Sequence, residues 1–104
     1  MAPRGSPISG RAVITTIVLI KADPKRIPEA AMKLAGIDGV QEVYSVSGEW
    51  DLVAIVKVAE YDQIAQVVTE SFPKVPGLQR TQTLTAFRAY SKKDLQQAWD
   101  IGVE

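Results

Sequence analysis

Four stretches of the chain carry the apolar pattern of β-strands. Residues 12–20 and 52–58 are almost continuous runs of apolar, mostly β-branched side chains, and residues 40–46 and 78–90 also have the composition of strands. Branched side chains are enriched in strands because they pack well on a pleated surface. The pattern therefore predicts four strands.

Two further stretches have the three-to-four-residue apolar spacing of helices. The first can be capped by Asp23 and opened by Pro24, and it stops at Gly36. Because Pro28 disfavours a helix interior, regular helix is expected to begin near it. The apolar face of this helix is made of Ile27, Ala30, Ala31 and Leu34. The second helix ends at Pro73, and its apolar face is made of Tyr61, Ile64, Ala65, Val68 and Phe72.

The two halves of the chain match each other at a constant offset of 38 residues. The offset aligns Ile14, Ile17, Val18 and Ile20 with Leu52, Ile55, Val56 and Val58. After each helix the pattern Gly-apolar-Gln recurs, at Gly39 and again at Gly77. Two such β-α-β units interleave into a four-stranded antiparallel sheet with both helices on one face. We therefore predict an α+β fold; chance similarity between two amphipathic stretches is the alternative.

The second face of the predicted sheet is also apolar. Both parities of the first and third strands are apolar. The first strand has Ala12, Ile14, Val18 and Ile20 on one parity and Val13, Ile17 and Leu19 on the other, and the third has Leu52, Ala54, Val56 and Val58 against Val53 and Ile55. A face of this kind left in water exceeds what monomers usually tolerate, so dimerisation through the sheets is expected. A short C-terminal helix is the alternative cover; its predicted residues are Ser91, Asp94, Leu95, Ala98 and Trp99.

Composition and charge narrow the classes of function. The 104 residues suffice for one domain, expected over residues 12–104 after a flexible Pro-, Gly- and Ser-rich leader at 1–11. Twelve basic and twelve acidic residues balance, so the basic excess of a nucleic-acid-binding surface is missing. With neither Cys nor His, disulfides, thiolate or imidazole metal sites and the commonest general base are excluded. We expect no cofactor, no metal and no enzymatic activity.

The first apolar run could instead be compared with a secretory signal peptide, since Arg4 and Arg11 precede it. Thr15 and Thr16 interrupt that run, and Lys21 follows it at once. It is also far too short to span a bilayer. A strand is therefore the favoured interpretation, with a cytoplasmic location and no membrane association.

The turn at residues 47–51 and the last strand carry the polar groups suited to a ligand. Gly48 would let backbone N–H groups approach an anion, while Asp51 would face a cation, as a free amino acid requires. Thr81, Thr83 and Thr85 share one strand parity and could line a polar pocket. The alternatives are a structural turn, an ordinary hydroxyl ladder on a wet face, and a carboxylate acid/base pair with Glu49 that nothing tunes for catalysis.

Three features together resemble the C-terminal ligand-binding (RAM) domain of Lrp/AsnC transcription regulators, over residues 12–90. They are the repeat, the turn Ser47-Gly-Glu-Trp-Asp51 before an apolar strand, and the stretch Val75-Pro-Gly-Leu-Gln-Arg-Thr-Gln-Thr-Leu84. The resemblance implies a ferredoxin-like βαββαβ fold and dimers that assemble into tetramers, octamers or larger rings. It also implies that a free amino acid binds between dimers.

The resemblance implies a set of ligand-binding residues in two groups. The turn contributes Gly48, Glu49, Trp50 and Asp51. Opposite it, the last strand contributes Thr83, Leu84, Thr85 and Ala86. Backbone and hydroxyl groups would hold the ligand carboxylate and the acidic turn residue its amino group. Trp50 is bulkier than the Tyr or Phe common in the family, so a different ligand side chain is expected.

One departure from the family bears on function. Full-length regulators carry an N-terminal helix-turn-helix domain, whereas eleven residues precede the first predicted strand here. We expect a stand-alone domain without direct DNA binding, with a full-length Lrp/AsnC regulator as a further partner through mixed assembly. A small dimeric α+β-barrel enzyme, an ACT-type regulatory domain and a ligand-free assembly module are the competing interpretations.

Overall fold

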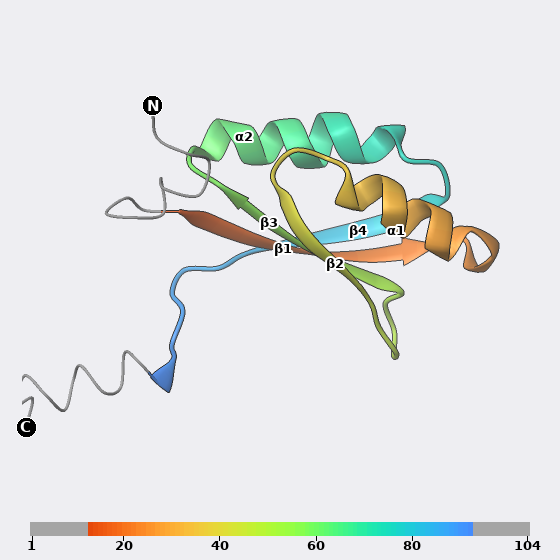
Figure 1. Ribbon diagram of the computed structural model, residues 1–104, viewed down its shortest axis with the longest axis horizontal. Helices are drawn as coiled ribbons and strands as arrows, with labels where there is room; N and C mark the ends of the chain where they lie inside the picture. Colours follow the sequence, from red (N-terminus) through yellow and green to blue (C-terminus); the bar gives the residue numbers. More distant parts are fainter. Residues whose placement is uncertain (1–12, 93–104) are drawn as a thin grey trace, which may run out of the picture.

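The chain folds as one antiparallel sheet with two helical segments packed on one of its faces (Figure 1). A computed structural model describes residues 13–92. Its elements are β1 (Ile14–Ala22), α1 (Ile27–Ala35), β2 (Val40–Ser45), β3 (Leu52–Val58), α2 (Tyr61–Ala65) and β4 (Leu78–Thr85). The strand order is β2-β3-β1-β4, and every neighbouring pair is antiparallel. The predicted α+β, ferredoxin-like βαββαβ fold is confirmed.

The register of the sheet shows how the two halves interleave. The equivalent strands β1 and β3 lie side by side in the centre of the sheet, each flanked by one edge strand. Ile17 pairs with Ile55, which is its own equivalent in the repeat. Gly39 and Gly77 are equivalent as well, and both have left-handed backbone conformations, with φ of 97° and 93°. The repeat deduced from the offset is therefore a repeat in three dimensions.

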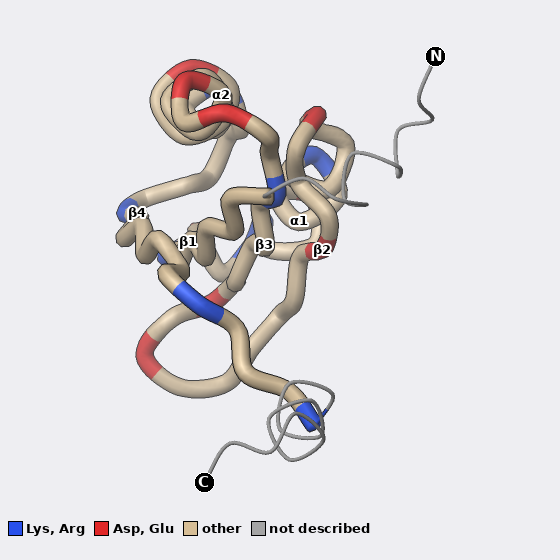
Figure 2. Tube along the Cα trace, turned by 90° about the vertical axis from the view of Figure 1, so that its left-hand side faces the viewer, with Lys and Arg blue, Asp and Glu red and all other residues tan. Residues whose placement is uncertain are grey.

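The core lies between the sheet and the helices (Figure 2). Side chains alternate across a strand, so every second residue of β1 and β3 faces the helices. The central strands bury Val18, Ile20, Ala22, Leu52, Ala54, Val56 and Val58. The helical layer buries Ala30, Leu34, Val67 and Phe72 against them. Each large apolar side chain buried in this way contributes about 1.5–3 kcal/mol, so this layer holds the fold together.

The first helix begins as the sequence predicts. Asp23 Oδ1 accepts a hydrogen bond of 3.0 Å from the backbone N–H of Lys25, which caps a short 3₁₀ turn at Pro24–Arg26. Regular helix starts at Ile27, so Pro28 falls in the first turn, where its missing N–H costs no helical bond. The helix ends before Gly36.

The second helix departs from the predicted apolar stripe. After α2 the chain continues as a π-helix at Gln66–Ser71 and a 3₁₀ turn at Phe72–Lys74. Tyr61 is 68% exposed and Ala65 is exposed too, whereas Val67, which the stripe omits, is buried. The prediction was wrong at these three positions. Val67 lies in the π-helix, where i→i+5 bonding adds a residue to the turn and rotates the buried face, whereas Tyr61 and Ala65 lie on the exposed side of the regular helix before it.

Strand boundaries also differ from the prediction. The first strand spans Ile14–Ala22 rather than 12–20, the second ends at Ser45 rather than at 46, and the last ends at Thr85 rather than at 90. The last strand stops there because its partner β1 begins at Ile14. The final backbone bond joins Ala86 N–H to Thr15 C=O at 2.9 Å, and the chain then leaves the sheet (Figure 1). The expected leader at 1–11 and the body of the expected C-terminal helix lie outside the described residues.

Within residues 13–92 no helix has the length and apolar character needed to cross a membrane.

Candidate ligand site at the turn between β2 and β3

The turn between β2 and β3 is closed by its own backbone. The Val46 N–H donates to the Asp51 carbonyl at 3.1 Å, and Gly48 adopts a φ of 110°. Apart from its chain neighbours, no atom lies within 4 Å of where a Gly48 side chain would begin, so this glycine serves the backbone conformation and not a close approach. The turn thus presents an open surface at Gly48.

Asp51 is fixed by the neighbouring strand. Its backbone N–H donates to the Ile20 carbonyl at 2.9 Å, and its Oδ2 accepts from the Ala22 N–H at 2.9 Å. The carboxylate therefore bonds across the sheet to the end of β1, 29 positions away in sequence, and not to its own turn. Only one of its two oxygens takes part in a hydrogen bond among the described residues.

Two basic side chains that the sequence analysis missed complete this corner. Lys21 Nζ donates to the Glu49 carbonyl at 2.8 Å, and the Arg80 guanidinium lies 4.8 Å from the centre of the Trp50 ring. Lys21 and Arg80 face each other in the register of β1 and β4. Lys21 could have been noticed in the sequence, because it is a charged residue at the end of an apolar strand. That it lies opposite Arg80 depends on the register of β1 and β4, which cannot be read from the local sequence.

The predicted residues of the last strand lie elsewhere on the sheet. Thr83 is opposite Val18 and Thr85 is opposite Thr16, whereas the turn adjoins the end of β1 around Lys21. The two groups are therefore separated by three to five positions of β1, or about 10–17 Å. Within one chain they do not form a common pocket. The three threonines of β4 are exposed and share the helix-side parity of Val18.

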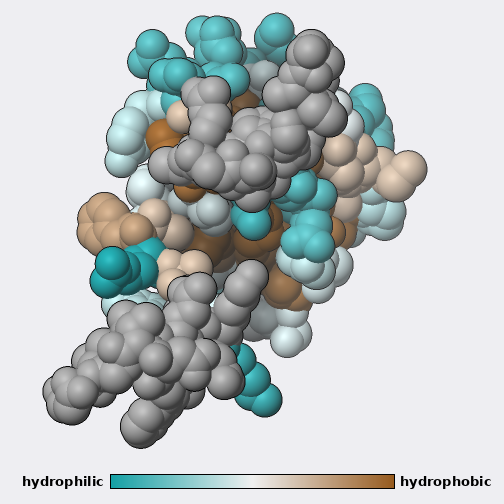
Figure 3. Space-filling model, turned by 60° about the vertical axis from the view of Figure 1, so that its left-hand side comes forward, coloured by the Kyte–Doolittle hydropathy of each residue, from teal (hydrophilic) through white to brown (hydrophobic). Residues whose placement is uncertain are grey.

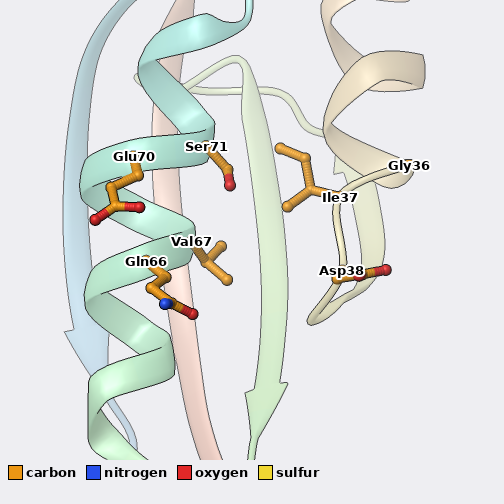
Figure 4. Close-up of a pocket in the computed structure, with 7 residues that line it drawn as sticks. All are labelled: Gly36, Ile37, Asp38, Gln66, Val67, Glu70 and Ser71. Carbon is orange, nitrogen blue, oxygen red and sulfur yellow. The ribbon is translucent and has the colours of Figure 1, made fainter.

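Hollows border the helical segment at residues 66–73 in the described part of the molecule. A groove of about 190 Å³ runs between the second helix and β4, and its lining is Val68, Phe72, Pro73, Leu78, Gln79, Arg80 and Thr81. A larger hollow of about 430 Å³ lies between the end of α1 and the π-helix. There Ile37, Val67 and Ser71 point toward one another, while Asp38 and Glu70 point outward (Figure 4). Of the threonines predicted to line a polar pocket, Thr81 borders the groove, whereas the turn residues 48–51 and residues 83–86 line neither hollow.

The sheet face away from the helices is apolar and uncovered by residues 13–92. Half-buried Ile17, Leu19, Val53 and Ile55 form its centre. Tyr44 and Leu84 flank them with exposed fractions of 48% and 41%. A hydrogen bond to Glu42 raises the pKa of the Tyr44 phenol. We call these six residues the open face. Apolar side chains elsewhere also reach the surface among hydrophilic ones (Figure 3).

The described residues form neither a large basic surface nor a metal site. Lys and Arg positions are spread over the described trace rather than gathered on one face (Figure 2). Residues 13–92 contain no group of three or more acidic, His or Cys side chains arranged to hold a metal ion.

The four-stranded antiparallel sheet with both helices on one face (Figure 1) defines an α+β domain of the ferredoxin-like class. The family model described as the Lrp/AsnC ligand binding domain matches residues 15–95. The chain therefore belongs to the Lrp/AsnC ligand-binding domain family, as the sequence resemblance predicted.

Individual relatives agree with this assignment. An uncharacterized HTH-type transcriptional regulator of Pyrococcus furiosus is 36% identical over 76 residues, which cover 70% of this chain and 51% of the relative. The crystal structure of TTHA0845 from Thermus thermophilus is 41% identical, with a TM-score of 0.71 over 75% of this chain and 98% of that one. The chain thus spans about half the length of the curated regulator and nearly all of the Thermus protein.

A more distant structure shares the fold. The transcriptional regulator NMB0573 of Neisseria meningitidis, crystallised as a complex with L-Met, is 16% identical, with a TM-score of 0.71 over 88% of this chain and 60% of that one. At this identity the comparison shows the fold alone.

Proposed function

We propose that this chain is an amino-acid-sensing regulatory domain that dimerises through its open face and binds a free amino acid where dimers meet. The observation that carries the ligand proposal is Asp51, held rigidly by the Ala22 N–H with its second oxygen unused, beside the open surface of Gly48. A carboxylate fixed in this way can accept a hydrogen bond from an ammonium group without losing its structural bond. The L-Met complex of the distant Neisseria regulator supports an amino acid as the class of ligand.

The separation of the two predicted groups supports assembly. The turn residues and Thr83–Ala86 lie about 10–20 Å apart along β1 in one chain, farther than one small amino acid reaches. A site that uses both groups must take them from different copies. Dimers that associate into a tetramer, an octamer or a larger ring would supply them.

The regulatory setting is proposed from the curated relatives, which are HTH-type transcriptional regulators. Mixed assembly with a full-length Lrp/AsnC regulator would let this domain change DNA binding without contacting DNA itself. Residues 12–104 are the proposed domain and residues 1–11 its leader. Purification of the tagged chain from cells that contain such a regulator should recover it; recovery of none would contradict this part.

A thermal-shift screen of the twenty common amino acids tests the ligand proposal. An amino acid at 100 times its Kd should stabilise the fold by about 2.7 kcal/mol, on the order of 10 °C in Tm. A screen in which no amino acid moves the Tm would refute the proposal.

Asp51→Asn is the informative variant. It keeps an oxygen that can accept from the Ala22 N–H but removes the negative charge, so the shift should vanish while the oligomeric state is retained. Asp38→Asn changes the same charge on an exposed loop and is the matched control, for which the shift should be unchanged.

A further inference from the structure

Two cations stand directly opposite each other at the corner of the sheet beside the turn. Lys21 of β1 and Arg80 of β4 are register partners, and their side chains lie on the same face as Ile17 and Leu19. Like charges directly opposite on neighbouring strands destabilise a sheet. The pair of Lys21 and Arg80 is therefore not explained by the stability of the sheet, and a role in binding would explain it.

Neither cation is neutralised by an acid among the described residues. Lys21 is held by the Glu49 carbonyl at 2.8 Å, and Arg80 by the face of the Trp50 ring at 4.8 Å. Both partners are uncharged. The one ion pair within residues 13–92 joins Lys33 and Glu29 on α1. The positive charge of the corner therefore remains available to an anion.

The turn holds both cations in place and leaves donors to spare. An ammonium has three N–H donors, of which the Glu49 carbonyl uses one. A guanidinium stacked on an aromatic face keeps its N–H edges free for the two oxygens of a carboxylate. The corner thus combines the compact charge of an ammonium with the two-pronged donor geometry of a guanidinium, both of which form charge-assisted hydrogen bonds with carboxylates.

A negative group lies next to them. Asp51 donates its backbone N–H to the Ile20 carbonyl and accepts from the Ala22 N–H with Oδ2, so its bonds to β1 fall on the two residues that flank Lys21. The end of β1 therefore brings one carboxylate and two cations to the same corner of the sheet. Groups of both signs at one corner suit the ammonium and the carboxylate of one free amino acid.

We propose that Lys21 and Arg80 bind the α-carboxylate of the amino acid whose ammonium group Asp51 binds. This inference rests on the proposed function. In this proposal the two cations bind the ligand carboxylate, a role that the family resemblance assigns to backbone and hydroxyl groups. It also gives Trp50 a role, because its ring positions the Arg80 guanidinium.

Trp50 fluorescence tests the inference directly. Trp99, the other tryptophan, is replaced by Phe so that emission reports Trp50 alone. Each amino acid that is active in the thermal screen is titrated together with its α-amide, which lacks the negative charge. The amino acid should change the emission and the amide should bind at least tenfold more weakly.

Lys21→Met and Arg80→Gln should each raise the Kd of the amino acid at least tenfold and reduce the preference for acid over amide. Lys21→Arg keeps the charge and should retain binding. Lys57→Met is the matched control, because Lys57 is a lysine on the same sheet face, opposite Thr15, away from the turn. Its Kd should stay within twofold of the parent. Loss of acid-over-amide preference is a readout that a merely structural defect would not produce.

The outcomes separate the two proposals. If an amino acid binds Lys21→Met and Arg80→Gln as tightly as the parent, with the same preference over its amide, the inference is overturned and the proposed function stands. If no amino acid binds the parent, sodium acetate is titrated instead. Saturable quenching of Trp50 that both variants lose would support the anion site while the amino-acid proposal fails. No response to acetate would overturn the inference as well.

Discussion

The two faces of the sheet are built from the same strands but meet different surroundings. On the helix side, Val18, Ile20 and Val56 are fully buried within one chain. On the other side, Ile17, Leu19 and Ile55 are only half-buried, although they too are branched aliphatic residues. One face completes the fold of a single chain, and the other has apolar surface that this fold does not use. The comparison shows that one parity of the strands stabilises the single chain, and under the proposed function the opposite parity would serve assembly.

The largest expected effect is the loss of the dimer when the open face is given a charge. Ile55→Lys places a charge at the centre of the open face, where a sheet-to-sheet dimer would bury it unpaired. The variant should sediment as a single chain of 11.3 kDa, whereas the parent should sediment as a dimer or larger. Its far-UV circular dichroism should remain that of the parent.

Glu70→Lys makes a charge change on the exposed helical layer and should leave the mass of the assembly unaltered. A parent that sediments as a monomer at high concentration would contradict the interpretation of the open face.

A smaller effect distinguishes a glycine next to the buried core from one in the open turn. A Cβ at Gly39 would lie 3.2 Å from methyl groups of Val58 and Val67, at a φ of 97°. Gly39→Ala should therefore cost about 2–4 kcal/mol, from left-handed strain and crowding together. Gly48→Ala has the same kind of strain but no neighbour within 4 Å, and should cost about 1–2 kcal/mol. Urea unfolding of both variants measures the difference; equal losses would show that crowding at Gly39 is relieved.

The smallest expected effect is a gain in the free energy of unfolding. Thr16 is fully buried on the helix side, and its Oγ1 has no hydrogen-bond partner within the described residues. Thr16→Val replaces that hydroxyl by a methyl of similar size and should stabilise the chain by about 1 kcal/mol. Thr15→Val, on the opposite parity, is the control and should change the free energy of unfolding less. A loss of stability in Thr16→Val would mean that the hydroxyl is satisfied.

Much of the fold was predictable because its signals are local or repeated. The alternation of residues along the strands indicated that both faces of the sheet are apolar. The offset of 38 residues made Gly39 and Gly77 equivalent, and the structure gives both the same left-handed conformation. The π-helix at Gln66–Ser71 was missed because a stripe counted at 3.6 residues per turn assumes regular helix. The end of β4 depends on where its partner strand β1 begins, and this cannot be read from the sequence of β4 itself.

The candidate site was predictable only in its acidic part. The turn with Gly48 and Asp51 is contiguous in sequence, so its composition was visible. The cations Lys21 and Arg80 come together through the pairing of the first strand with the last, which is a property of the topology. The residues proposed on β4 follow from the family resemblance, and their use in a common site remains a prediction about the assembly.

The repeat has one place where its two copies do not correspond. Shifted by 38 positions, the turn at 47–51 falls on residues 85–89, where the chain leaves the sheet instead of folding into a hairpin. Inside the units the equivalent strands β1 and β3 pair with each other, so a substitution in one half also alters its packing against the other half. The turn at 47–51 has no equivalent hairpin in the second half. Under the proposed function, changes of ligand preference are therefore expected in this turn, while the duplicated units serve as the scaffold.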